Sequence, residues 1–295
     1  MPELPEVETV RRGLERRVVG ARIAHVEVSG ERTVRRLGRE AIIDGLSNTR
    51  IDSARRRGKY LLCDLDSGGV LMMHLRMSGR VLVAPVGAQR PLHTHVALTL
   101  VRPAALTGRE SSEPPTSDDR CEMWFVDPRT FGEVVVFDRH DEARVAPELA
   151  RLGPDPIVDG LDVPTLHEIL RGRRGNLKAL LLNQHAIAGI GNIYADEILH
   201  RARLRDDRRP DSLPPAAVRR LHLAIHDVLR AAIDAGGSTL DDTQYVDVDG
   251  ATGWFQTEHR VYGRAGERCL TCNRGRIVRR VVAGRTTCAC LVCQR

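Results

Sequence analysis

Four cysteines near the end of the chain have the spacing of a metal site. Cys269 and Cys272 form one C-x-x-C pair, Cys290 and Cys293 form a second, and residues 273–289 separate them. This arrangement is typical of a four-thiolate zinc ribbon. The stretch between the pairs alternates like a β-hairpin and carries five arginines, so we expect a zinc-stapled hairpin that enters a groove or grips phosphates. The simpler interpretation is that zinc only staples a tail too short to fold alone.

A second candidate site is the turn in "QHAIAGIGNIYADEIL" at 184–199. Gly189 and Gly191 permit a tight turn between two helices, and Asn192 is placed to cap the second helix and leave backbone N–H groups facing an anion. A glycine turn before a helix is common and carries little weight alone. With Lys178 and the basic hairpin nearby in the chain, it favours a phosphate-binding surface.

The first residues, "MPELPEVETV", combine a proline behind the initiator methionine with carboxylates at Glu3 and Glu6. Pro2 is a stiff start, and an acidic first turn complements the dipole of a helix. The apolar face of that helix consists of Val7, Val10, Leu14 and Val18. Taken alone, the pattern predicts a helix packed on a core.

Composition limits the class of protein. The 295 residues, 42% of them hydrophobic, are enough for a sizeable core and suggest about two domains. We find no run of eighteen apolar residues and no signal-peptide pattern, so we expect a soluble cytoplasmic protein. Cys63 and Cys121 stand alone in apolar strand-like surroundings and are expected to be inert core thiols.

The charge favours a polyanionic partner. The net charge is +6, the pI is near 9.2, and most of the 45 basic residues are arginine. Only 3% of residues are aromatic, which argues against a surface that stacks many single-stranded bases. Duplex DNA fits this composition better.

The elements that must position these residues fall into two regions. Short apolar and alternating runs punctuated by glycine predict a β-sandwich or barrel over roughly residues 20–140. The segment 103–120, rich in Pro, Ser and acidic residues, interrupts a hairpin and is expected to be a solvated insertion. From residue 153 onward the period becomes helical. The last helix is expected to begin at Pro214 and Pro215 and to stop at Gly236 and Gly237.

Seven segments of the chain, in order, resemble one family. They are "MPELPEVETVRRGL", "RRGKYLL", "HLRMSG", "DPRTFG", "LLNQHAIAGIGNIYADEILH", "GWFQTEHRVYGRAGERC" and the cysteine ribbon. Together they resemble the bacterial formamidopyrimidine-DNA glycosylases of base-excision repair. The resemblance implies an α+β fold, with a catalytic β-sandwich domain at 1–140, a helix-two-turn-helix domain with a lesion-capping loop at 141–255, and a zinc finger at 256–295.

The resemblance also implies a reaction. Excision of 8-oxoguanine and formamidopyrimidines from duplex DNA, followed by β,δ-elimination, would proceed through a Schiff base on Pro2. An α-amino group titrates about two pH units below lysine, so the amine exposed by loss of Met1 is a usable nucleophile. In this scheme Glu3 shuttles protons to the sugar, Glu6 helps order the site, and Lys59 contacts the backbone phosphate near the lesion.

Other positions match the family's DNA contacts. Met77 would fill the space left by the flipped base, Arg129 would pair with the orphaned base, and Phe131 would insert into the opposite strand. The DNA-binding set implied by the resemblance consists of His74, Met77, Arg129, Phe131, Lys178, Asn192 and Arg285. One structural zinc ion is implied on Cys269, Cys272, Cys290 and Cys293. We expect a monomer that works on the bacterial nucleoid and has no membrane partner.

The sequence departs from the family pattern at several positions. Thr130 replaces a second arginine of the wedge loop, Asp241 stands near where some members have a lysine, and Cys288 replaces an aromatic residue in the ribbon, where it is a spare thiol. The lesion preference is therefore open, and an endonuclease VIII-type enzyme for oxidised pyrimidines is one alternative. A non-catalytic zinc protein that binds damaged DNA is another.

Overall fold

The computed structural model describes residues 2–103, 119–240 and 245–295, so most of the 103–120 insertion and Asp241 lie outside the described residues. The chain forms two compact units. The first contains Met1–Pro2, Glu6–Ala150 and Ser238–Gly253, and the second contains Glu3–Pro5, Arg151–Gly237 and Trp254–Arg295. Residues 256–295 thus pack within the helical unit, and the three-part division of the sequence stays a prediction.

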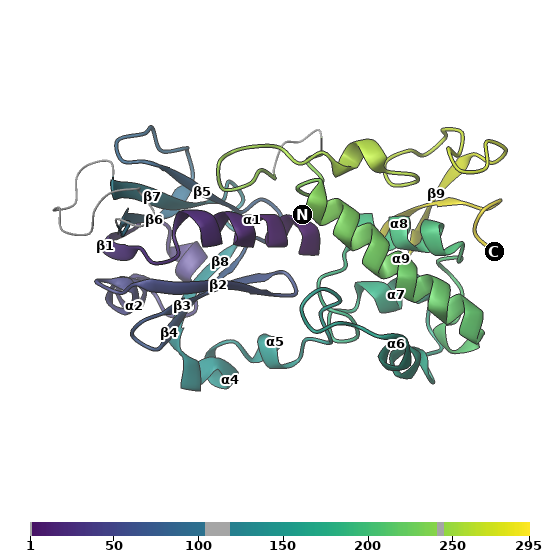
Figure 1. The fold of residues 1–295 in the computed structure, drawn as a ribbon, viewed down its shortest axis with the longest axis horizontal. Helices are drawn as coiled ribbons and strands as arrows, with labels where there is room; N and C mark the ends of the chain where they lie inside the picture. Colours follow the sequence, from purple (N-terminus) through teal and green to yellow (C-terminus); the bar gives the residue numbers. More distant parts are fainter. Residues whose placement is uncertain (1, 104–118, 241–244) are drawn as a thin grey trace. The chain divides into compact units, whose positions relative to one another are not determined.

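The first unit contains two antiparallel four-stranded sheets, which confirms the predicted β-sandwich (Figure 1). One sheet has the order β1-β6-β7-β5 and the other has the order β2-β3-β4-β8. The strands are β1 (Arg22–Val28), β2 (Ile51–Arg57), β3 (Tyr60–Leu65), β4 (Gly69–His74), β5 (Arg80–Pro85), β6 (Thr94–Val101), β7 (Arg120–Val126) and β8 (Glu133–Asp138).

Short helices accompany the sheets. The sandwich is joined by α1 (Leu4–Arg17), η1 (Glu31–Val34), α2 (Arg39–Leu46), η3 (Arg139–Asp141), α4 (Glu142–Val145) and α5 (Pro147–Ala150). The helix expected at the N-terminus is confirmed as α1, since the apolar residues Val7, Val10 and Leu14 along it are all fully buried.

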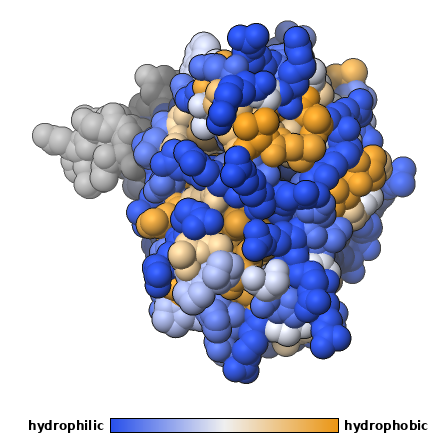
Figure 2. Space-filling view, turned by 90° about the vertical axis from the view of Figure 1, so that its right-hand side faces the viewer, coloured by the Kyte–Doolittle hydropathy of each residue, from blue (hydrophilic) through white to orange (hydrophobic). Residues whose placement is uncertain are grey.

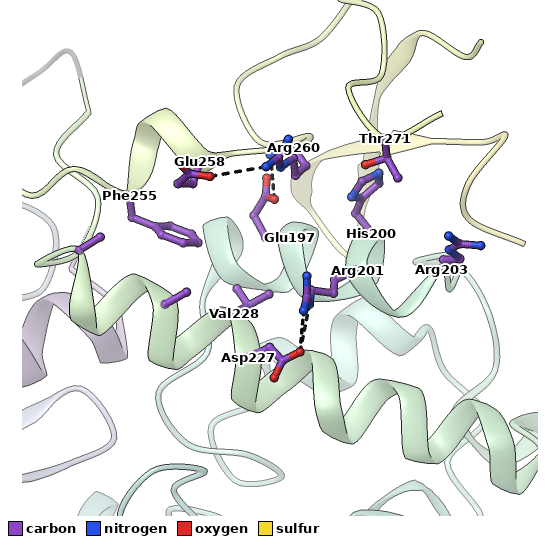
Figure 3. A pocket seen from close by; sticks show the side chains of 12 residues that line it. Glu197, His200, Arg201, Arg203, Asp227, Val228, Phe255, Glu258, Arg260 and Thr271 are labelled. Atoms are coloured by element: carbon purple, nitrogen blue, oxygen red, sulfur yellow. Dashed lines mark hydrogen bonds and ion pairs between the residues drawn. The ribbon is translucent and has the colours of Figure 1, made fainter. Parts of the chain in front are cut away.

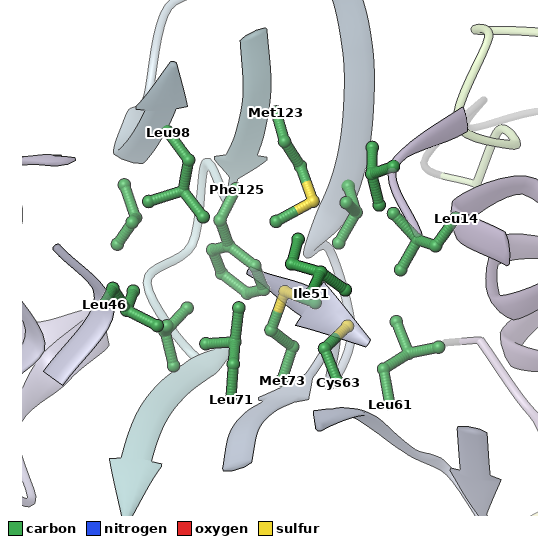
Figure 4. Packing of buried hydrophobic residues seen from close by; sticks show 14 of the residues in the cluster. Leu14, Leu46, Ile51, Leu61, Cys63, Leu71, Met73, Leu98, Met123 and Phe125 are labelled. Carbon is green, nitrogen blue, oxygen red and sulfur yellow. The ribbon is translucent and has the colours of Figure 1, made fainter. Parts of the chain in front are cut away.

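The main hydrophobic core lies between the two sheets (Figure 4). Leu98 and Phe125 from one sheet meet Leu71 and Met73 from the other, because alternate residues of a strand point to the same face. Cys63 is part of this core, and burial raises its pKa to about 12. The prediction that Cys63 is a core thiol is confirmed.

The second unit is mostly helical and ends in a hairpin. Its elements are α6 (Val163–Leu170), α7 (Leu177–Leu182), α8 (Asn192–Ala202), η4 (Pro210–Ser212), α9 (Pro215–Asp234), η5 (Phe255–Glu258), β9 (Ile277–Val282) and β10 (Arg285–Cys290). The predicted bounds of the last helix are confirmed, because α9 starts at Pro215 and the chain turns at Gly236 with φ of 72°. Proline fits a first helical turn and glycine fits the left-handed exit.

The described part of the chain has no helix long and apolar enough to cross a membrane. Figure 2 shows one face of the molecule, where hydrophilic side chains cover most of the surface around separate hydrophobic areas. Such a surface is compatible with the charged partner that the composition favours.

The core packing predicts a large effect of one truncation. Leu71 is 1% exposed, so Leu71→Ala removes its transfer free energy and leaves a cavity, and we expect a loss of about 2–5 kcal/mol in the free energy of unfolding. The urea transition, followed by Trp124 fluorescence in a Trp254→Phe background, measures this. Leu92→Ala is the matched control, since Leu92 is 82% exposed. Equal losses in the two variants would contradict the assigned core.

Candidate active site and nucleic-acid interface

Glu3 is fixed by the N-terminus of α8. Its carboxylate accepts hydrogen bonds from the backbone N–H groups of Gly191 at 2.8 Å, Ile193 at 2.9 Å and Tyr194 at 3.4 Å. The first N–H groups of a helix have no partner within the helix, and its dipole favours an anion there. Glu3, only 2% exposed, is therefore held by both hydrogen bonding and charge.

The turn before α8 is shaped around Glu3. A Cβ atom at Gly191 would lie 2.3 Å from the Glu3 carboxyl carbon, and Gly189 has a φ of +91° next to Leu4. Gly191, and not Asn192, occupies the N-cap position. The expectation that Asn192 caps α8 is therefore wrong, and the anion at these N–H groups is the chain's own carboxylate.

Pro2 is buried and directly precedes this anchored residue. The next residue, Leu4, donates its N–H to the carbonyl of Gly189 at 3.0 Å, so residues 3 and 4 are both tied to the turn. Pro2 thus adjoins a rigid attachment, which limits where its nitrogen can point.

Glu6 ties α1 to a later segment of the first unit. Glu6 is 1% exposed, and its carboxylate accepts the N–H of Ser238 at 2.7 Å. Ser238 begins the segment that contains the predicted lesion-capping region, and Tyr245 and Val248 of that segment join the sandwich core. Glu6 therefore orders the start of that segment.

Lys59 and His74 lie in the same part of the first unit. Lys59 occupies the turn between β2 and β3, His74 ends β4, and both are buried. Burial, together with the charges of Arg76 and Lys59, lowers the pKa of His74 to about 3. Its Nδ1 accepts the N–H of Arg76 at 3.0 Å and its ring packs edge-on against Tyr60, so His74 is a neutral support for the loop that follows.

Three residues predicted to enter DNA lie on two loops of the first unit. Met77 is 41% exposed and Phe131 is 43% exposed, unlike the buried methionines and phenylalanines of the sandwich. The guanidinium of Arg129 lies over the Phe131 ring, 4.8 Å from its centre. Exposed apolar side chains beside an arginine are suited to insertion between bases.

One buried carboxylate connects these two loops. Asp127 accepts the hydroxyl of Ser78 at 2.5 Å, the N–H of Arg129 at 3.2 Å and the N–H of Gly132 at 2.6 Å. Ser78 follows Met77, so the loops that carry Met77 and Phe131 share one fully buried anchor. Sequence reasoning missed this role of Asp127, although an acidic residue before the Pro of "DPRTFG" is a turn signal.

The four predicted zinc ligands come together in the second unit. The sulfurs of Cys269, Cys272, Cys290 and Cys293 all lie within 4.8 Å of one another. The Cys269–Cys293 and Cys272–Cys290 sulfur pairs are each 3.7 Å apart. A tetrahedron with Zn–S bonds of about 2.3 Å has edges of about 3.8 Å, so the cluster fits one structural zinc ion. Cys288 lies outside this group, with its N–H bonded to Asp196.

Lys178 has a position different from the one expected for a phosphate contact. It is fully buried, and its ammonium bonds Asp196 at 2.7 Å, the Thr286 carbonyl at 2.9 Å and the Thr287 hydroxyl at 2.8 Å. Desolvation raises the pKa of Asp196 to about 6 despite this partner. Lys178 therefore holds β10 against α7 and α8 from inside.

The hairpin region is attached to α8 by a second carboxylate. Glu197 accepts the N–H groups of Arg260, Val261 and Tyr262 at 2.8–3.0 Å. Figure 3 shows the bond between Glu197 and Arg260. Asn192, the first residue of α8, bonds the Tyr262 side chain. Arg285, at the start of β10, is exposed. The sequence shows Asp196 and Glu197 only as two adjacent acidic residues on a helix, and this pattern does not predict that they anchor other segments.

Two family models match most of the chain. The model of the formamidopyrimidine-DNA glycosylase N-terminal domain matches residues 1–134, and that of the formamidopyrimidine-DNA glycosylase H2TH domain matches residues 152–244. The formamidopyrimidine-DNA glycosylase of Nocardioides sp. is 42% identical over 297 residues, which cover this whole chain and 94% of that protein. The Thermus thermophilus enzyme is 42% identical over 294 residues, covering 100% and 98%.

Solved structures agree. The MutM (Fpg) protein of Thermus thermophilus superposes with a TM-score of 0.83 at 41% identity, over 99% of this chain and 98% of that one. A complex of Lactococcus lactis Fpg with DNA containing an abasic site gives a TM-score of 0.84 at 34% identity, over 99% of both chains. Likeness to these proteins extends over the whole length of the chain.

The Glu3 anchor predicts that position 191 tolerates only glycine. Gly191→Ala places a methyl group against the Glu3 carboxylate, so we expect a loss of about 1–3 kcal/mol in the free energy of unfolding of the second unit. Urea denaturation measures it. Gly175→Ala is the matched control, because nothing lies within 4 Å of its Cβ position, and it should stay within about 0.5 kcal/mol. A neutral Gly191→Ala would show that the carboxylate is not held as described.

Proposed function

Because this chain belongs to the formamidopyrimidine-DNA glycosylase family, and is a DNA glycosylase and abasic-site lyase, we propose that Pro2 is the nucleophile of its reaction. The observation that carries the proposal is the anchoring of Glu3 by α8, since Pro2 is the residue directly before it. Once Met1 is removed, Pro2 carries a secondary amine with an ordinary pKa near 8, so an appreciable fraction is uncharged at neutral pH.

The proposed reaction, base excision followed by two eliminations, needs no reactant other than the DNA and water. The Pro2 nitrogen lone pair forms a bond to C1′ as the bond to the damaged base breaks. The base leaves with the electron pair of that broken bond and takes up a proton, and the nitrogen, now positively charged, releases its own proton. The C1′–O4′ bond then breaks, O4′ takes up a proton, and the nitrogen lone pair completes an iminium ion with C1′. The iminium accepts electrons as a C2′ proton is lost and the 3′ phosphate departs. A second elimination releases the 5′ phosphate, and water frees Pro2 by hydrolysis.

Carboxylates and a lysine assist this sequence. Glu3, whose carboxylate is fixed by the N-terminus of α8, shuttles protons at the sugar ring. Glu6 orders the site by holding Ser238, and Lys59 contacts the phosphate next to the lesion. These roles rest on the match of each residue to the family motif and on the burial of all three.

Extrusion of the base requires a wedge and a grip on the duplex. Met77 fills the vacated space, Arg129 pairs with the orphaned base and Phe131 enters the opposite strand, which offsets unstacking that costs a few kcal/mol. Asn192 and Arg285 bind the backbone phosphates. Lys178 supports this grip indirectly by holding Thr286, the neighbour of Arg285, and zinc, when bound, staples the same hairpin.

The substrates we propose are 8-oxoguanine and formamidopyrimidine lesions in duplex DNA. Solved relatives include a Lactococcus lactis Fpg mutant in complex with DNA containing Fapy-dG, which supports the formamidopyrimidine part. Arg129 and Phe131, both present on the wedge loop, favour purine lesions over the oxidised pyrimidines of the endonuclease VIII type. We also propose that the protein acts as a monomer on the bacterial nucleoid, since its full-length relatives are bacterial.

Borohydride trapping tests the nucleophile. Reduction of the iminium during reaction with a duplex carrying 8-oxoguanine opposite cytosine should give a covalent adduct, and mass analysis should place it on Pro2. Pro2→Gly should lower the trapped fraction while leaving binding to a duplex with a stable abasic analogue intact, because only the nucleophile has changed.

Two comparison duplexes make this result specific. One contains a preformed abasic site and the other contains undamaged guanine. An adduct only with the abasic duplex would remove oxidised purines as substrates, and an adduct only with an oxidised-pyrimidine duplex would favour the endonuclease VIII type. An adduct on Lys59 would show that Pro2 is not the nucleophile. Binding of the damaged duplex without any adduct would favour a non-catalytic protein.

The shared anchor of the two wedge loops predicts a base-flipping defect. Asp127→Asn leaves a buried N–H or hydroxyl without an acceptor, which costs the arranged loops about 1–3 kcal/mol of free energy. If base flipping needs the loops in this arrangement, kcat/KM for 8-oxoguanine excision should fall roughly 5- to 150-fold. Fluorescence of 2-aminopurine next to the lesion measures flipping separately. Asp138→Asn is the matched control on an exposed loop-facing aspartate. Unchanged flipping in Asp127→Asn would show that the loops do not depend on it.

A further inference from the structure

His200 lies beside the zinc ligands without being one of them. Its Nε2 is 3.7 Å from the sulfur of Cys269. Among the described residues, the group that can hold a metal contains only the four cysteines, which already fill a tetrahedral zinc. His200 comes from α8, whereas the cysteines come from the hairpin region, so the contact joins two separate elements.

The side chain is held in place by its helix. Asp196 and Glu197 on α8 accept backbone N–H groups of Cys288 and of residues 260–262. His200 is four residues beyond Asp196, so it lies on the same face of α8, one turn later. It is 4% exposed, and the remaining edge lines a cavity of about 560 Å³ next to Thr271 (Figure 3).

The thiolates of the metal centre need hydrogen-bond donors. Four thiolates and one Zn²⁺ carry a net charge of about −2, and Cys269 and Cys290 are fully buried. A buried charge is costly unless hydrogen bonds support it. The Cys272 sulfur receives the backbone N–H of Gly275 at 3.4 Å. At Cys269 the imidazole of His200 occupies the corresponding place, and a neutral imidazole offers one N–H.

We propose that His200 is a positioning residue of the zinc centre, which donates its Nε2–H to the Cys269 thiolate and thereby strengthens metal binding. A zinc-bound thiolate offers lone pairs and no proton, so the hydrogen must come from the imidazole. The contact fixes the tautomer of His200 with Nδ1 bare. It also fastens the metal centre to α8, the helix that holds Glu3 at its other end.

The test compares three variants of the full-length protein loaded with zinc or with Co²⁺. His200→Leu removes the donor, His200→Gln keeps an N–H, and His222→Leu is the matched control, because it removes an imidazole bonded to the Leu161 carbonyl away from sulfur. Competition with a chromophoric chelator should show zinc affinity about 10- to 100-fold lower in His200→Leu, near that of the unsubstituted protein in His200→Gln, and unchanged in the control.

Cobalt spectra separate this role from a purely structural one. Loss of the hydrogen bond raises the energy of the sulfur lone pairs, so the sulfur-to-cobalt charge-transfer band should move to longer wavelength in His200→Leu and return in His200→Gln. The four-thiolate ligand-field bands should stay in all variants. A three-sulfur, one-nitrogen spectrum in the unsubstituted protein would overturn the proposal, and so would equal affinity and spectra in His200→Leu and the control.

Nitrogen NMR of the unsubstituted zinc protein covers the case in which His200→Leu does not fold. The nitrogen chemical shifts of His200 should show that Nε2 carries a proton and that Nδ1 carries none. A proton on Nδ1 instead would overturn the proposal.

Discussion

The seating of the Glu3 carboxylate on the N-terminus of α8 is the constraint on which the candidate active site depends. Three backbone N–H groups that no residue within the helix can satisfy converge on one carboxylate from the start of the chain. Pro2, the buried residue directly before Glu3, is covalently joined to this anchored residue. Chemistry at a chain terminus otherwise suffers from fraying, because terminal residues are poorly ordered unless they are tied down.

Buried carboxylates that accept backbone N–H groups also hold other loops of the protein. Asp127 gathers the N–H groups of the wedge loop, Glu197 gathers those of residues 260–262, and Glu6 takes that of Ser238. A carboxylate accepts several hydrogen bonds at once, and hydrogen bonds to a charged acceptor are stronger than neutral ones. Loops without regular hydrogen-bond ladders can therefore be rigid where function needs rigidity, while their outer side chains, such as Phe131, remain exposed.

Local patterns predicted those features that depend on neighbours in the chain. The start of α9 at Pro215, the apolar face of α1 and the C-x-x-C pairs follow from turn chemistry, helical period and ligand spacing. The features that could not be predicted depend on residues far apart in sequence. Glu3 and Gly191 are 188 positions apart, so the local sequence favours Asn192, the nearest residue of a suitable type, as the N-cap of α8. Lys178 looked like a phosphate contact for the same reason, since its partner Asp196 lies on another helix.

Net charge is likewise a weaker guide to DNA binding than the positions of individual arginines. Arg56 is buried against Glu8, Arg36 is shared between Glu133 and Glu148, and Arg280 pairs with Asp206. Each of these guanidiniums is already engaged within the protein and releases no counterion from a phosphate backbone. The electrostatic contribution to DNA binding scales with the phosphates actually contacted. It must therefore come from exposed basic groups, and much less from the arginine content as a whole. Arg285, at the start of β10, is exposed.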